Sequence, residues 1–183
     1  MPDIRLIASD MDGTLLSADL TVSPRNAEAI RAAQEKGVIF AVCSGRFAQF
    51  GAMKMREAGI SCPVIAANGA CIWDDAEKKI IKTFPIPAKT ALKVNALLRE
   101  YGVYYCIFAP DLITASQEGT THLKSFWKHP VLTETYGLGF SNKAADIERT
   151  AAEGKALKFY VGRLPDNVYE RLDADLKKSM EFM

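Results

Sequence analysis

The chain has 183 residues, of which 49% are apolar and 25% charged, and its formal net charge is +1. This composition is typical of a globular protein of one large or two small domains, and the near-neutral charge favours neither nucleic acid nor a membrane surface as a partner. No apolar run reaches the roughly 20 residues that span a bilayer. The four cysteines form no C-x-x-C pair. We therefore expect a cytoplasmic protein with reduced thiols.

The first part of the chain alternates apolar strands with amphipathic helices. Ser23 is a suitable N-cap, Pro24 suits the first helical position, and Gly37 ends the first helix. The pattern predicts strands at 4–9, 38–42 and 63–67, and helices at 22–37 and about 47–58.

This alternation predicts a parallel sheet covered on both faces, with right-handed crossovers. Ligands of open α/β sheets bind at the carboxyl ends of the strands. Polar and small residues follow each of the three predicted strands, and we expect them to converge at one edge: Asp10 and Asp12, Ser44 and Gly45, and Asn68 and Gly69.

The remainder of the chain has a different sequence pattern. A β-hairpin is predicted over 70–84, with its turn at 74–78, and the prolines of 85–89 indicate a boundary. A second α/β module should follow, with the stretch 119–145 left open as short helices and loops. Its predicted elements are helices at 88–101 and 166–178 and strands at 103–108, 112–115 and 156–161.

The acidic pair after the first strand suits phosphoryl transfer. Asp10 can act as a nucleophile that accepts the phosphoryl group, and Asp12 can transfer a proton to the leaving oxygen. Two carboxylates also form a hard oxygen site for Mg²⁺. Gly13 and Thr14 can offer backbone N–H groups to phosphoryl oxygens. Asp-x-Asp-Gly is equally common in simple turns, and this alternative stays open for the motif alone. An EF-hand is excluded, because position twelve from Asp10 is Thr21 and not Glu.

The hydroxyl of Ser44 and the glycine N–H of Gly45 would form an anion site at a helix N-terminus. A Ser-Gly pair after one strand is a weak signal. Together with the acidic pair at a neighbouring strand end, it favours a phosphate site over a structural turn.

Three motifs carry a resemblance to the haloacid dehalogenase superfamily. The segment DMDGTLL (10–16) resembles its first motif, DxDGT, and SGR (44–46) resembles its second. The segment ANGA (67–70), followed by a hairpin, resembles a stretch of the Cof-type subfamily. The resemblance implies an α/β fold with a Rossmann-like parallel-sheet core (1–85) and an inserted α/β cap domain (86–183), and a Mg²⁺-dependent phosphatase of small phosphorylated metabolites such as sugar phosphates.

The resemblance also implies roles for individual residues. Asp10 would be the nucleophile and a metal ligand, and Asp12 the general acid/base and a metal ligand through its carbonyl. Ser44 would hold a phosphoryl oxygen. Arg46 and Asn68 would support the site or contact the substrate.

The lysine of the third motif and the acidic fourth motif of the superfamily are not found. Lys155 and Lys158 belong to a cap-like strand, and Asp173 and Asp175 to a polar helix face. We therefore expect a truncated form of a longer enzyme, with an incomplete core and an exposed strand edge through which it could self-associate. A phosphotransferase or mutase of the same superfamily, or an inactive phosphate-binding fragment, remain the alternatives.

Overall fold

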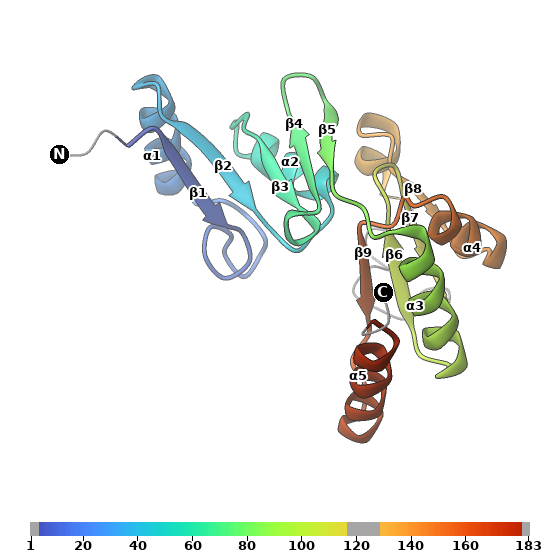
Figure 1. Ribbon diagram of the computed structural model, residues 1–183. Helices are drawn as coiled ribbons and strands as arrows, with labels where there is room; N and C mark the ends of the chain where they lie inside the picture. The colour runs from blue at the N-terminus through green and yellow to red at the C-terminus, as the bar shows by residue number, and fades with distance from the viewer. Residues whose placement is uncertain (1–3, 117–128, 181–183) are drawn as a thin grey trace. The chain divides into compact units, whose positions relative to one another are not determined.

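The chain divides into two compact units. A computed structural model describes residues 4–116 and 129–180 (Figure 1). The first unit comprises Met1–Phe84 together with Pro130–Tyr136, and the second comprises Pro85–His129 and Gly137–Met183. His122, Phe126 and Trp127, for which the sequence favours packing or surface roles over metal or substrate binding, lie outside the described residues. In the part of the chain that is described, no helix is long and apolar enough to cross a membrane.

A five-stranded sheet forms the centre of the first unit, in the order β1-β2-β3-β4-β5. The first three strands are parallel, as the sequence predicted, and the last two are antiparallel. The bounds are β1 Leu6–Asp10, β2 Ile39–Cys43, β3 Val64–Ala66, β4 Cys71–Asp74 and β5 Lys79–Thr83. The parallel arrangement brings the carboxyl ends of β1, β2 and β3 to the same edge.

The two connecting helices, α1 (Pro24–Glu35) and α2 (Ala48–Glu57), occur where the sequence predicted them. The side chain of Ser23 accepts a hydrogen bond from the Asn26 N–H at 3.2 Å, which confirms it as the N-cap of α1. Beyond the helix ends, Gly37 and Gly59 adopt φ values of +79° and +70°, a left-handed conformation that glycine adopts without a Cβ penalty.

Both helices pack on the same face of the sheet. Ile7 and Phe40 are register partners in β1 and β2 and line a hollow with α1. Val42, two residues beyond Phe40 on the same face, pairs with Val64. Val64 lies directly under Gly51 of α2, so close that a Cβ at Gly51 would be 2.6 Å from Val64 Cγ1.

The expectation that helices cover both faces is not met within the described residues. Leu6 and Ile39 are register partners on the opposite face, and they are 57% and 56% exposed. The reason is the strand order. Successive right-handed crossovers that advance in one direction, from β1 to β2 to β3, place every crossover helix on the same side.

The β4–β5 hairpin forms as predicted, with Asp74 Oδ1 accepting hydrogen bonds from the N–H groups of Ala76 and Glu77. A short π-helical segment, η2 (Val131–Thr135), packs against α2. Tyr136, directly after it, lies with its ring centroid 5.8 Å from that of Trp73 in β4. No local pattern in the sequence indicates that this distant segment belongs to the first unit.

The second unit is a four-stranded sheet in the order β8-β7-β6-β9, with helices α3 and α4 in contact with each other and α5 in contact with α3. Its core is a cluster of apolar side chains that includes Leu98, Tyr105 and Ile107. The predicted strands and helices are present, whereas β8 and α4 lie in or beyond the stretch left open. The bounds are α3 Ala88–Glu100, β6 Tyr105–Phe108, β7 Leu112–Ala115, β8 Gly139–Ser141, α4 Ala144–Ala152, β9 Lys158–Val161 and α5 Asp166–Met180.

Candidate active site

Asp10 is the last residue of β1, at the edge where the three parallel strands end. The chain then turns sharply around Met11, which is fully buried and whose carbonyl accepts hydrogen bonds from the N–H groups of Leu15 and Leu16 at 3.1 and 2.8 Å. The Thr14 hydroxyl donates to Asp10 Oδ2 at 3.4 Å, a long contact. The buried Met11 therefore anchors a turn that leaves the Asp10 carboxylate at the exposed edge.

Asp12 forms a two-point ion pair with Arg46. The Arg46 Nε and Nη2 groups donate to Asp12 Oδ2 and Oδ1, each at 2.8 Å. The guanidinium also lies over the ring of Phe50, with its central carbon 4.4 Å from the ring centroid. The structure thus connects the first motif to the second through a side-chain contact.

Ser44 and Asn68 meet through the backbone. The Asn68 N–H donates to the Ser44 carbonyl at 3.1 Å, and the Ala67 N–H donates to the Arg46 carbonyl at 2.8 Å. Asn68 adopts a φ of +61°, which asparagine tolerates better than most residues. These bonds hold the residues after β2 against those after β3. The Ser44 side chain is buried, and its Oγ accepts the Arg46 N–H at 3.2 Å.

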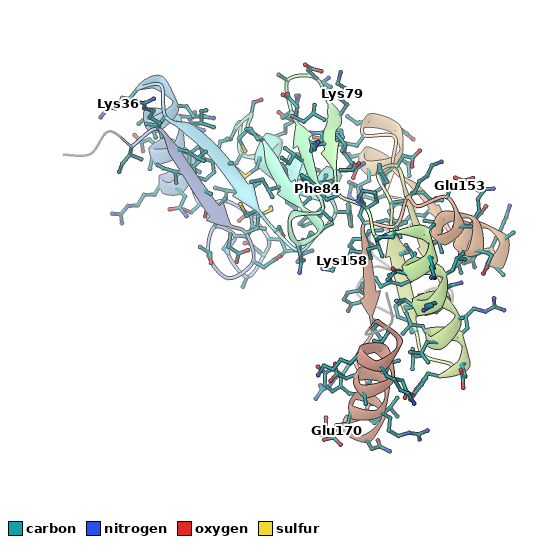
Figure 2. All side chains as sticks on the ribbon, in the orientation of Figure 1. Lys36, Lys79, Phe84, Glu153, Lys158 and Glu170 are labelled. Atoms are coloured by element: carbon teal, nitrogen blue, oxygen red, sulfur yellow. The ribbon has the colours of Figure 1, made fainter. Side chains whose placement is uncertain are left out.

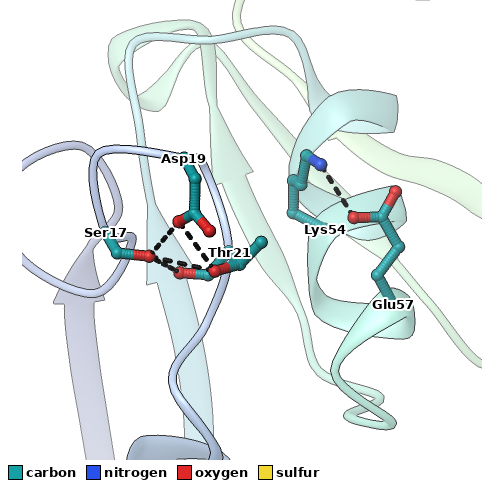
Figure 3. A network of polar contacts seen from close by, with 5 residues as sticks. All are labelled: Ser17, Asp19, Thr21, Lys54 and Glu57. Atoms are coloured by element: carbon teal, nitrogen blue, oxygen red, sulfur yellow. Dashed lines mark hydrogen bonds and ion pairs between the residues drawn. The ribbon is translucent and has the colours of Figure 1, made fainter.

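The loop that follows the acidic pair is closed by a network of hydroxyl groups (Figure 3). The hydroxyls of Ser17 and Thr21 both donate to Asp19 Oδ1, at 2.5 and 2.8 Å. These hydrogen bonds, that from Ser17 above all, lower the pKa of Asp19 below its ordinary value. Figure 3 also shows the Lys54–Glu57 ion pair of 2.7 Å, three residues apart on α2. Asp19 is occupied within its own loop, so it adds no ligand to the acidic pair.

Two features of the edge bear on metal binding. Among the described residues, no three His, Cys, Asp or Glu side chains gather as a metal cluster. Mg²⁺, however, is commonly held by one or two carboxylates together with water and substrate phosphate. Asp10 offers such a carboxylate, whereas that of Asp12 is bound to Arg46. Of the two carboxylates, that of Asp10 is therefore the one whose chemistry fits Mg²⁺, together with water and substrate phosphate.

The late lysines and acids are engaged within the second unit. Lys155 pairs with Glu153 at 2.7 Å, and the Nζ atom of Lys158 in β9 lies 5.8 Å from the centroid of the Phe108 ring. Figure 2 labels Glu153 and Lys158. Burial lowers the pKa of Lys158. On α5, Asp173 pairs with Lys177 at 2.6 Å, and Asp175 accepts a hydrogen bond from a tyrosine hydroxyl. Each of these four residues therefore has a contact within the second unit.

Sequence reasoning placed Arg46 near the site without identifying Asp12 as its partner, and it missed Phe50. Arg46 lies before α2, which begins at Ala48, so the helical i, i+4 rule does not apply to its contact with Phe50 and gave no signal for it. The Asp12 contact spans 34 positions, and no local pattern predicts it.

The parallel strands, the carboxylates after β1 and the Ser-Gly-Arg turn after β2 define an α/β protein with an acidic site at the carboxyl edge of its sheet. The chain belongs to the haloacid dehalogenase-like hydrolase family, whose sequence pattern matches residues 7–180.

Individual relatives are similar over part of their length. The chain is 38% identical to phosphatase YwpJ of Bacillus subtilis over 117 residues, which is 63% of this chain and 40% of that protein. A crystal structure of a Thermotoga maritima protein superimposes with a TM-score of 0.74 at 18% identity, covering 98% of this chain and 63% of the other. A structure described as a subclass IIB sugar phosphatase of the superfamily superimposes with a TM-score of 0.64 at 17% identity, covering 94% of this chain and 64% of the other. The chain thus spans about two fifths of the length of YwpJ.

Proposed function

We propose that the protein carrying this chain is a Mg²⁺-dependent phosphomonoester hydrolase that works through an aspartyl phosphate at Asp10. The observation that carries the proposal is that the residues after the three parallel strands are joined by hydrogen bonds at the edge of the sheet where Asp10 ends β1. Arg46 binds Asp12, and Asn68 binds the backbone of Ser44. Family membership and the similarity to a named phosphatase support the reaction class.

The reaction takes two steps. In the first, a carboxylate oxygen of Asp10 attacks phosphorus, the bond from phosphorus to the ester oxygen breaks, and that oxygen takes the proton of the Asp12 carboxyl group and leaves as an alcohol. In the second, water attacks phosphorus and gives a proton to the Asp12 carboxylate. The bond from phosphorus to Asp10 then breaks, which releases inorganic phosphate and restores both acids.

The other residues at the edge orient the phosphoryl group. The Ser44 hydroxyl and the backbone N–H groups of Gly13, Thr14 and Gly45 would donate to its oxygens. When bound by Asp10 and Asp12, Mg²⁺ neutralises charge between the anionic nucleophile and the anionic phosphate. Phosphoryl transfer depends chiefly on such positioning and charge stabilisation.

The substrate would be a small phosphorylated metabolite such as a sugar phosphate. The fold likeness to a subclass IIB sugar phosphatase supports the proposal that the second unit acts as a cap that selects the substrate. The exposed apolar side chains of the edge strand β1, Leu6 among them, support self-association as a further proposal.

Phosphate release from p-nitrophenyl phosphate in the presence of Mg²⁺, without a sugar acceptor, tests the proposal. Asp10→Asn should lower turnover about 10³-fold or more, because it removes the nucleophile. Asp173→Asn, on an exposed helix, is the matched control and should retain activity. Turnover that persists in Asp10→Asn would refute the aspartyl phosphate, and release that requires a sugar acceptor would favour a phosphotransferase.

A further inference from the structure

Arg46 is held at three separate points. Its N–H donates to Ser44 Oγ, its carbonyl accepts the Ala67 N–H, and its guanidinium rests on the ring of Phe50. Phe50 is fully buried in α2. Because the backbone and the side chain of Arg46 are both anchored, the direction in which the planar edge of its guanidinium faces is restricted.

That planar edge is directed at Asp12. The Nε and Nη2 donors reach one carboxylate oxygen each at 2.8 Å, the two-point geometry that a guanidinium forms with a carboxylate and that lysine cannot reproduce. The Asp12 side chain is 44% exposed. An aspartate so exposed on a turn would otherwise sample several rotamers.

We propose that Arg46 is a positioning residue for Asp12 rather than a ligand of the phosphoryl group. The two N–H donors hold the ionised carboxylate; when Asp12 carries the proton that it passes to the leaving oxygen, one of the two contacts opens and the other keeps the side chain in place. This inference rests on the proposed function. A misplacement of about 1 Å in a reacting group can cost about 10²-fold in rate, so the two-point contact matters for the step in which Asp12 acts.

Two esters with different leaving groups can distinguish a positioning role of Arg46 from a role in phosphate binding. Benzyl phosphate and p-nitrophenyl phosphate are similar in size, but benzyl alkoxide needs a proton to leave, whereas nitrophenolate leaves as an anion at neutral pH. The ratio kcat/KM reports the steps up to departure of the alcohol, before the common hydrolysis of the aspartyl phosphate. A defect in the placement of Asp12 therefore affects the benzyl ester selectively.

The experiment measures kcat/KM of both esters for the unaltered protein and for Arg46→Ala, Arg46→Lys and Asp12→Asn. Arg46→Ala and Arg46→Lys should lower the value for benzyl phosphate about 10²-fold and that for p-nitrophenyl phosphate less than about 3-fold. Asp12→Asn should show the same selectivity. Adding Arg46→Ala to Asp12→Asn should cause little further loss, because both changes remove one function.

An equal loss for both esters, carried by a higher KM, would identify Arg46 as a phosphate ligand and overturn the inference. Recovery in Arg46→Lys, or no selectivity in any variant, would overturn it as well. If the unaltered protein hydrolyses neither ester, the proposed function itself fails. Urea unfolding midpoints within error of the unaltered protein will show that each variant is folded.

Discussion

The substitution Gly51→Ala tests the packing of α2 against the sheet, because its effects on helix propensity and on packing are opposite in sign and differ in size. Alanine is favoured over glycine in a helix interior by about 1 kcal/mol, so the helix alone predicts stabilisation. The structure predicts the opposite. The new Cβ would be 2.6 Å from Val64 Cγ1 and 3.5 Å from the sulfur of Met11.

Val64 has little room to yield. Its side chain is fully buried and β-branched, and its strand is hydrogen-bonded on both sides, to β2 and to β4. Overpacking of this kind costs about 1–3 kcal/mol, and the short approach to a stiff side chain points to the upper half of that range. We therefore expect a net loss of about 1–2 kcal/mol in the free energy of unfolding.

Urea denaturation followed by circular dichroism measures this loss, and a double-mutant cycle identifies its cause. In a Val64→Ala background the contact is relieved, so Gly51→Ala should then stabilise by about 1 kcal/mol. The sign of its effect should thus reverse between the two backgrounds. A higher urea midpoint for Gly51→Ala in the unaltered protein would refute the reasoning, since it would mean that α2 moves away from β3 at little cost.

Two further predictions concern local features of the fold. Ser23→Ala removes the hydroxyl that caps α1 and should lower the free energy of unfolding by about 1 kcal/mol, measured by the same urea titration; an unchanged midpoint would mean that water replaces the cap. Burial raises the pKa of Cys62 to about 12 and those of Cys71 and Cys106 to about 11. In the folded protein at pH 8 these thiols should resist an aromatic disulfide reagent and react only after unfolding. Because their folded-state pKa values are raised, their contribution to stability is present below the ordinary thiol pKa of about 9 and is lost as the pH rises above it. Rapid reaction of all four thiols in the folded protein would contradict the buried placement.

Local signals in the sequence account for most of the regular structure. The Ser23-Pro24 start and the glycine end define α1, and the Asp74 turn defines the hairpin, because each depends on bonds within a few residues. By contrast, β8 has only three residues and no periodicity. Its first residue, Gly139, pairs with Leu112 of β7 at a position where a Cβ would be 3.1 Å from Leu112 Cδ1.

The candidate site likewise has features that local sequence signals predict and features that they do not. The convergence of Asp10, Ser44 and Asn68 follows from strand direction and crossover handedness, which apolar runs and glycines reveal. The contact between Arg46 and Asp12 depends on side-chain rotamers of residues far apart in the sequence, so it emerges only from the folded chain. The π-helical segment at Val131–Thr135 is unpredictable for a similar reason, since its place in the first unit is determined by packing against α2 and Trp73.

The strand order leaves one face of the sheet open. It also explains why residues from a short part of the chain make all the described contacts at the carboxyl edge of the sheet. Each hydrogen bond described at the edge joins residues between 10 and 68, and the helices that support these residues pack on a single face. The acid pair, the arginine and the Ser44 turn therefore depend on β1 to β3 and their two helices. Substitutions in the second unit should consequently leave the Asp12–Arg46 contact in place.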